Sequence, residues 1–229
     1  MGLREAFADL VLGAECAGCG SPGAAVCASC TTVLSTTTPF TAWPDPVPPG
    51  LPAPTAAAPY DGVLRKVILA HKEEGHYALA RPLGEALARS VRSALGEEQA
   101  AWLCPVPSTP STVRRRGHDP LRRVAIAGVK ELRRQGYDVR LADALAVVRR
   151  PVDQAGLSAG ERAANLAGAF AARSRWAERL TDQTILLVDD VLTTGSTLTE
   201  AARALSDRGI PVLGCAVVAA TPRRPVSGS

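Results

Sequence analysis

The stretch that decides the fold reads Ile185-Leu186-Leu187-Val188-Asp189-Asp190-Val191-Leu192-Thr193-Thr194-Gly195-Ser196-Thr197. Its first four residues are apolar and predict a buried strand at 184–188, and the apolar spacing that follows predicts a helix over 196–207. A strand that enters a helix through a loop of small residues presents backbone N–H groups and the positive end of the helix dipole to an anion. The sequence therefore predicts a cradle for one phosphate monoester.

The acidic pair within this stretch narrows the choice of ligand. Carboxylates beside a phosphate repel it unless they accept hydrogen bonds from another part of the same ligand, and ribose hydroxyls supply such hydrogens. The sequence lacks the Gly-rich motifs of nucleoside triphosphate and dinucleotide sites, which disfavours both ligand classes. The other interpretation is a strand that ends in two solvated Asp residues before a helix cap rich in Ser and Thr. As ligands of ribose hydroxyls and of one phosphate we expect Asp189, Asp190, Thr193, Thr194, Gly195, Ser196 and Thr197.

Helical and strand-like patterns alternate through the rest of the chain after residue 60. We expect helices at 62–74, 77–95, 120–135, 161–166 and 196–207, and strands at 101–104, within 139–148, at 184–188 and at 212–218. Such alternation is typical of helices packed on a parallel sheet. The predicted fold class is α/β: a doubly wound, mainly parallel sheet with flanking helices, plus a small N-terminal zinc module built on four cysteines.

The domain organisation is predicted from a shift in composition. Eight prolines between residues 36 and 59 remove backbone donors and favour extended backbone, so we expect a Pro-rich linker there. The predicted units are then an N-terminal helix and zinc-binding module at 1–35, the main domain at 60–220 and a flexible tail at 221–229.

Four cysteines near the N-terminus form two Cys-x-x-Cys pairs that are separated by seven residues: Cys16, Cys19, Cys27 and Cys30. Two such pairs can surround one Zn2+ tetrahedrally, and an ion with all four positions filled by sulfur has a structural role. Redox-active or unrelated cysteines are the alternative. The other two, Cys104 and Cys215, lie in apolar segments, where we expect buried and inert thiols.

The overall charge favours a phosphate-bearing partner. The 229 residues carry a formal charge of +4, and 23 of the 26 basic residues are Arg, although a GC-rich genome would produce the same bias.

No apolar run approaches the ~18 residues of a membrane span, so no span is expected. Glu5 and Asp9 interrupt the N-terminal segment where a signal peptide would be apolar. We expect a cytoplasmic protein.

The run 188–197 resembles the binding motif of type I phosphoribosyltransferases. The resemblance implies a type I phosphoribosyltransferase-like fold, with 5-phosphoribosyl-1-pyrophosphate or ribose-5-phosphate as the ligand. It also implies that the two acids hold the ribose 2' and 3' hydroxyls and that the Thr-Thr-Gly-Ser-Thr part holds the 5-phosphate.

A basic segment follows the predicted strand 101–104 and contains Arg114, Arg115, Arg116 and Gly117. Loops at the carboxyl ends of strands line the ligand crevice of a doubly wound sheet, so this segment can face the phosphate loop. Arg114, Arg116 and Gly117 are then candidates for the pyrophosphate side of the site, together with Mg2+. A solvated basic turn and a patch for nucleic acid are the alternatives.

Further segments resemble one branch, the ComF family of competence-associated proteins, which has a phosphoribosyltransferase-like domain and an N-terminal zinc ribbon. They are Pro105-Val106-Pro107 with Arg116-Gly117, Tyr60-Asp61-Gly62 leading to Lys72, and Gln154-x-x-Leu157 with Arg162, Asn165 and Phe170. Lys72 fits a solvated helix end equally well. Where the branch has Phe-Asn-Gln after Arg-Gly, this sequence has His118-Asp119-Pro120. Asp119 adds negative charge to the pyrophosphate side unless it caps the following helix.

Three functions remain open. The first is a Mg2+-dependent phosphoribosyltransferase that displaces pyrophosphate from the ribose C1. The second is a non-catalytic adaptor that senses the sugar phosphate and uses the zinc module and the Arg segment to contact single-stranded or branched DNA or a competence or DNA-processing protein. The third binds ribose-5-phosphate without catalysis. The sequence identifies neither a general base nor an acceptor substrate. By the resemblance, segment 149–154 occupies the place where type I phosphoribosyltransferases have a mobile loop over the ligand.

Overall fold

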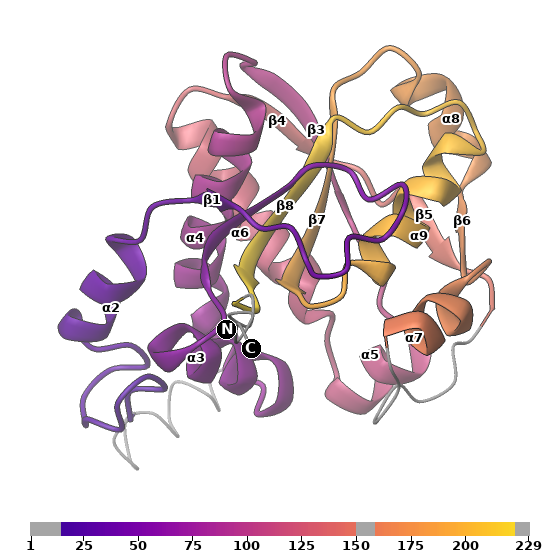
Figure 1. Cartoon of the computed structure of the whole chain (residues 1–229). Helices are drawn as coiled ribbons and strands as arrows, with labels where there is room; N and C mark the ends of the chain where they lie inside the picture. The colour runs from indigo at the N-terminus through magenta and orange to yellow at the C-terminus, as the bar shows by residue number, and fades with distance from the viewer. Residues whose placement is uncertain (1–14, 150–158, 223–229) are drawn as a thin grey trace, which may run out of the picture.

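The computed structural model describes residues 15–149 and 159–222 of the chain. Its main feature is a six-stranded sheet in the order β1-β2-β8-β7-β3-β4 (Figure 1). The strands are β1 (Phe40–Thr41), β2 (Pro54–Pro59), β8 (Gly214–Ala220), β7 (Ile185–Leu192), β3 (Ala100–Pro105) and β4 (Asp138–Leu141). Only the two-residue β1 pairs antiparallel, and the other neighbours are parallel. The expected mainly parallel sheet is therefore confirmed.

Helices cover both faces of this sheet. One face carries α3 (Gly62–Glu73), α4 (Ala80–Leu95) and α6 (Pro120–Arg134), and the other carries α9 (Ser196–Ser206), as Figure 1 shows. The central strand β7 is buried on both sides: Leu186 and Val188 join the core under α4 and α6, while Ile185 and Leu187 join the core under α9. Successive side chains of a strand point to opposite faces, which explains why a continuous apolar run marks this strand.

A smaller unit adjoins the α9 side. It contains the antiparallel pair β5 (Leu145–Val147) and β6 (Phe170–Ala172), with α7 (Ala159–Leu166) between them and α8 (Ser174–Leu180) after them. Glu200 of α9 accepts a hydrogen bond from the backbone N–H of Phe170 at 3.2 Å, and Arg203 donates to the Phe170 carbonyl at 3.1 Å. This paired clamp fixes β6 to α9. The sequence patterns did not predict β6 or α8.

The Pro-rich segment is part of the main domain, so the linker prediction is wrong for residues 54–59. These residues form β2 and pair in parallel with β8, for example Ala56 with Val217. The two prolines of β2 stand at its first and last positions, and the four residues between them retain their N–H groups for the ladder. Upstream, the segment turns so that Leu51 is buried against the start of α9.

The basic segment after β3 is a helix, α5 (Pro110–Arg116), where a loop was expected. Thr109 caps it by accepting a hydrogen bond from the Thr112 N–H at 3.2 Å, and Pro110 occupies the first turn. Gly117 ends it with a left-handed φ of +72°.

The remaining short elements are α2 (Ala28–Ser35) and the 3-10 turn η1 (Tyr77–Leu79). Strand β7 continues to Leu192, and β8 begins at Gly214 rather than at 212. Within the described ranges no helix combines the length and the apolar composition that crossing a membrane requires. The expected N-terminal helix before the cysteines, the segment 150–154, Leu157 and the tail after Pro222 lie outside the described residues.

Candidate functional site

The candidate site lies where the direction of the chain across the sheet reverses. After β3 the chain passes through α6 to β4 on one side, and after β7 it passes through α9 to β8 on the other. In open α/β sheets, ligands bind in the crevice beyond the carboxyl ends of strands at such a switch point. A cavity of about 160 Å³ lies here, lined by residues 106–108 after β3 and by Asp189 and Asp190 from β7. Lys72, Arg116 and Thr197 complete its polar lining.

The predicted phosphate loop, residues 193–197, runs from the end of β7 into the first turn of α9. Gly195 precedes the first residue of α9 with a left-handed φ of +78°, and a Cβ atom at this position would lie 2.9 Å from the Leu51 side chain. Glycine is strongly favoured here, because the left-handed backbone conformation strains other residues and a side chain would press on Leu51. The hydroxyls of Thr194 and Ser196 share a hydrogen bond of 3.0 Å, and Thr193 is exposed. The first N–H groups of α9 have no partner within the helix and suit an anion.

The two acids differ in their surroundings. Asp189 accepts a hydrogen bond of 2.8 Å from the Asp190 backbone N–H, whereas Asp190 forms a 2.7 Å ion pair with the Lys72 ammonium. Burial and the charge of Asp190 raise the pKa of Asp189 to about 7, against the opposing charge of Lys72. Burial alone would lower the pKa of Lys72, but the charges of Asp190 and Asp189 outweigh it and raise that pKa. Asp189 can therefore change its charge near neutral pH.

The sequence left the role of Lys72 undecided, and the structure gives it a place in the cavity. Lys72 belongs to the last turn of α3, which ends at the carboxyl edge of β7. It therefore contacts Asp190, although more than a hundred residues separate the two in the sequence. The side chain of Lys72 is 27% exposed and that of Asp190 is 14% exposed, so Lys72 is not a solvated helix-end lysine. The one sequence signal that could have found it was its place after Tyr60-Asp61-Gly62.

Of the pyrophosphate candidates, the structure brings only Arg116 into the cavity. Its side chain is 17% exposed and forms an ion pair with Glu73 at the end of α3. Arg114 is exposed on α5 and does not line the cavity. Gly117 lies beyond it and provides the sharp turn into His118.

His118-Asp119-Pro120, which differs from the pattern of the ComF branch, has a structural role in this chain. Asp119 is the N-cap of α6 and accepts a hydrogen bond from the Arg122 N–H at 3.1 Å, so its charge is used at the helix terminus. His118 is buried, with its ring edge-on to Tyr77 at 4.6 Å and to His71 at 5.7 Å. The ring of His118 therefore packs among the rings of Tyr77 and His71 just before the start of α6.

The four N-terminal cysteines form one cluster. Their sulfur atoms all lie within 4.8 Å of one another, and those of Cys19 and Cys27 are 3.6 Å apart. Tetrahedral Zn2+ with bonds of about 2.3 Å places its sulfurs about 3.8 Å apart, so this donor set fits the ion. Burial raises the pKa of the Cys16 thiol, but backbone hydrogen bonds, first among them that from Cys27, outweigh it and set the pKa at about 6. The cluster can hold a structural zinc.

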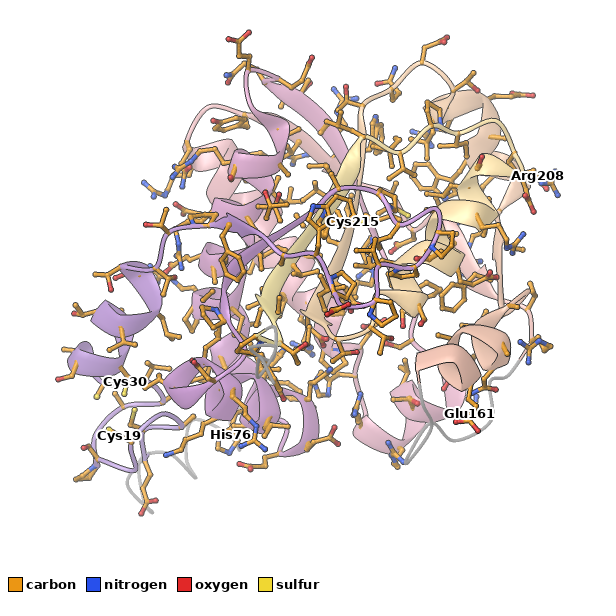
Figure 2. All side chains as sticks on the ribbon, viewed as in Figure 1. Cys19, Cys30, His76, Glu161, Arg208 and Cys215 are labelled. Carbon is orange, nitrogen blue, oxygen red and sulfur yellow. The ribbon has the colours of Figure 1, made fainter. Side chains whose placement is uncertain are left out.

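The cysteine cluster and α2 pack on α3 and α4, at the periphery of the molecule. Figure 2 shows Cys19 and Cys30 together at this edge, away from Cys215 in the sheet. Gly18 fits closely between Cys30 and Val63 of α3, since a Cβ atom there would lie 2.7 Å from the Cys30 sulfur. Arg89 of α4 donates to the backbone carbonyl of Leu34 in α2.

Comparison with known proteins agrees with this geometry. Residues 115–227 match the family model described as the phosphoribosyl transferase domain, which covers the end of α5 through β8 and the tail that follows. A search of curated proteins gave no match. The matched range contains β7, the acidic pair and the phosphate loop, whereas β2, α3 and β3 precede it. The chain therefore carries a phosphoribosyltransferase-type domain together with an N-terminal cluster of four cysteines.

Proposed function

We propose that the chain binds 5-phosphoribosyl-1-pyrophosphate at the switch-point cavity. The observation that carries this proposal is the joining of opposite charges at one cavity: Asp189 and Asp190 on β7, and Arg116 and Lys72 across from them. Carboxylates accept hydrogen bonds from ribose hydroxyls, and Arg and Lys bind the anionic oxygens of a diphosphate. We assign the ribose hydroxyls to the acidic pair and the 5-phosphate to the loop residues Thr193, Thr194, Gly195, Ser196 and Thr197.

The reaction we propose is a phosphoribosyl transfer. The lone pair of an acceptor forms a bond to the ribose C1, the C1–O bond breaks, and pyrophosphate leaves with the bonding electrons. Asp189 and Asp190 orient the ribose, and Arg116 and Lys72 stabilise the charge that develops on the leaving group. Bound Mg2+ would add Lewis-acid stabilisation of the pyrophosphate, and the carboxylate and phosphate oxygens at this cavity are the ligands it prefers.

Calorimetry in the presence of Mg2+ tests the binding. The wild-type chain should bind 5-phosphoribosyl-1-pyrophosphate and ribose-5-phosphate, and Asp190→Ala should weaken both, because it removes an acceptor for the ribose hydroxyls. Failure of the wild type to bind either compound would exclude the proposal. Release of pyrophosphate with candidate nitrogenous bases, lost in Asp190→Ala, would separate an enzyme from a protein that only binds ribose-5-phosphate.

A second candidate is an adaptor related to the ComF family, with a role in DNA uptake or processing. Two observations favour it: Arg114 and Arg115 are exposed outside the cavity, and a zinc held by four sulfurs has no open position for catalysis. Its partners would be single-stranded or branched DNA or a DNA-processing protein. Salt-sensitive DNA binding that survives Asp190→Ala, and is lost in Arg114→Ala with Arg115→Ala, would support it. We place either function in the cytoplasm, whose reducing conditions suit four zinc-binding thiolates.

A further inference from the structure

We propose that Lys72 and Glu73, consecutive residues at the carboxyl end of α3, set the affinity of the site for a diphosphate. In the free protein each of them is paired with a residue that the ligand needs: the ligand joins the Lys72–Asp190 pair, and it replaces Glu73 as the partner of Arg116. The inference rests on the proposed function: it explains how Lys72 can bind the diphosphate while it remains paired with Asp190, and it adds Glu73 to the residues that act on the same ligand.

The two ion pairs connect α3 to opposite sides of the cavity. Lys72 contacts Asp190 of β7 at 2.7 Å, and Glu73 pairs with Arg116 at the end of α5. Lys72, Asp190 and Arg116 all line the cavity, while Glu73 stands at its rim with 49% of its side chain exposed. The last turn of α3 thus contacts both Asp190, which would hold the ribose, and Arg116, which would hold the diphosphate.

Lys72 can serve the protein and the ligand at the same time. An ammonium group has three donors, and the contact with Asp190 uses one of them. In 5-phosphoribosyl-1-pyrophosphate the diphosphate is attached to C1, next to the carbon that bears the 2' hydroxyl. Because Lys72 contacts Asp190, and Asp190 would accept hydrogen bonds from the ribose hydroxyls, the Lys72 ammonium lies near the diphosphate. Its positive charge also reduces the repulsion between Asp190 and the anionic ligand. We assign Lys72 as a diphosphate-binding residue.

Glu73 lowers the affinity for a diphosphate, whereas Lys72 raises it. Arg116 binds a diphosphate best through a two-pronged edge of its guanidinium, but the edge formed by Nε and Nη2 contacts the Glu73 carboxylate in the free protein. A diphosphate that binds this edge displaces Glu73, which then leaves a negative charge at the rim. Since Glu73 is half exposed, it can be hydrated when released, and the exchange remains possible. Ribose-5-phosphate has no diphosphate at C1 and does not compete with Glu73, so Glu73 should lower the affinity of one ligand only.

Calorimetry on the full chain with Mg2+ tests this with three probes: 5-phosphoribosyl-1-pyrophosphate, inorganic pyrophosphate and ribose-5-phosphate. Glu73→Gln should raise the affinity for 5-phosphoribosyl-1-pyrophosphate and for pyrophosphate by about two- to fivefold, the range that corresponds to loss of one exposed ion pair. The affinity for ribose-5-phosphate should not change. Lys72→Gln should weaken the first two by roughly tenfold, with a smaller effect on ribose-5-phosphate. Thermal unfolding of each variant verifies that it is folded.

The matched control is Glu131→Gln, which makes the same change in charge. Glu131 pairs with Arg134 at 2.6 Å near the end of α6 and lies roughly 16 Å along that helix from Pro120, which lines the cavity. Screening over about 8 Å at physiological salt should leave all three affinities unchanged. If Glu73→Gln shifts no affinity, or shifts all three alike, the inference is wrong. If the wild type binds neither sugar phosphate, the proposed function itself is wrong.

Discussion

Ligand binding should depend on pH through Asp189. Its pKa is raised to about 7 by burial and by the charge of Asp190, and the ionised carboxylate accepts hydrogen bonds from ribose hydroxyls more strongly than the protonated acid does. With this pKa about nine tenths of the carboxyl groups are ionised at pH 8 and about one tenth at pH 6. The association constant for ribose-5-phosphate should therefore fall by up to about tenfold between these pH values through this group alone.

Asp189→Asn isolates that contribution. The ligand's own phosphate titrates near pH 6 and will add to the pH dependence of the wild type, but this addition is the same in the variant. Calorimetry at pH 6, 7 and 8 should show weaker binding by Asp189→Asn at pH 8 and a smaller slope with pH. Lys72→Met should move the midpoint upward, because the charge of Lys72 opposes the raised pKa of Asp189. Equal slopes in the wild type and in Asp189→Asn would refute the reasoning.

Stability should show the opposite dependence on pH. A carboxyl group whose pKa is raised on folding binds its proton more tightly in the native state, so the folded chain holds this proton between about pH 4 and pH 7 while the unfolded chain has released it. The contribution of Asp189 to the free energy of unfolding is full below pH 4 and is lost as the pH rises to 7, at up to about 1.4 kcal/mol per pH unit. Denaturant unfolding of Asp189→Asn should lack this decline.

Three further predictions concern the surroundings of the site. Gly195→Ala should weaken ribose-5-phosphate binding by roughly tenfold in calorimetry and destabilise the chain by about 1–3 kcal/mol, because φ is +78° and the new methyl group would lie 2.9 Å from Leu51. Asp119→Ala should lower the free energy of unfolding by about 1 kcal/mol through loss of the α6 cap while the affinity for 5-phosphoribosyl-1-pyrophosphate stays the same; tighter binding would show that its charge does reach the ligand. EDTA should remove Zn2+ and lower the unfolding temperature by roughly 5 °C or more, and Cys19→Ser should reproduce the effect without chelator; a metal-free wild type would contradict it.

The sequence predicted best those features that are encoded within one short segment. The run through β7 into α9 contains a strand that is buried on both faces, a glycine in a left-handed conformation that strains any other residue, and a helix with one apolar face. Asp119-Pro120 likewise predicted the start of α6, because cap and first turn are adjacent in the chain. Asp61 stands at the corresponding position of α3, but its side chain makes no capping hydrogen bond.

Features that depend on distant segments were missed. The prolines of 36–59 suggested a linker, since nothing local reveals that β8 lies beside residues 54–59 and pairs with them. The place of the three arginines after the predicted strand at 101–104 suggested a loop, although Thr109, Pro110 and Gly117 are the start and stop signals of a short helix. The role of Lys72 was undecided because its partner Asp190 is more than a hundred residues away in the sequence.

Helix α3 connects the two chemically distinctive parts of the molecule. Val63 in its first turn contacts the cysteine cluster, and Lys72 and Glu73 in its last turn reach the cavity. Twelve helical residues span about 18 Å, and Val67 and Ile68 between these ends are buried in the core. A helix fixed by packing along its length transmits its position from one end to the other. The cysteine cluster, in which a bound Zn2+ would have no open position for chemistry, can therefore contribute to ligand binding by holding α3 where Lys72 meets Asp190 and Glu73 meets Arg116.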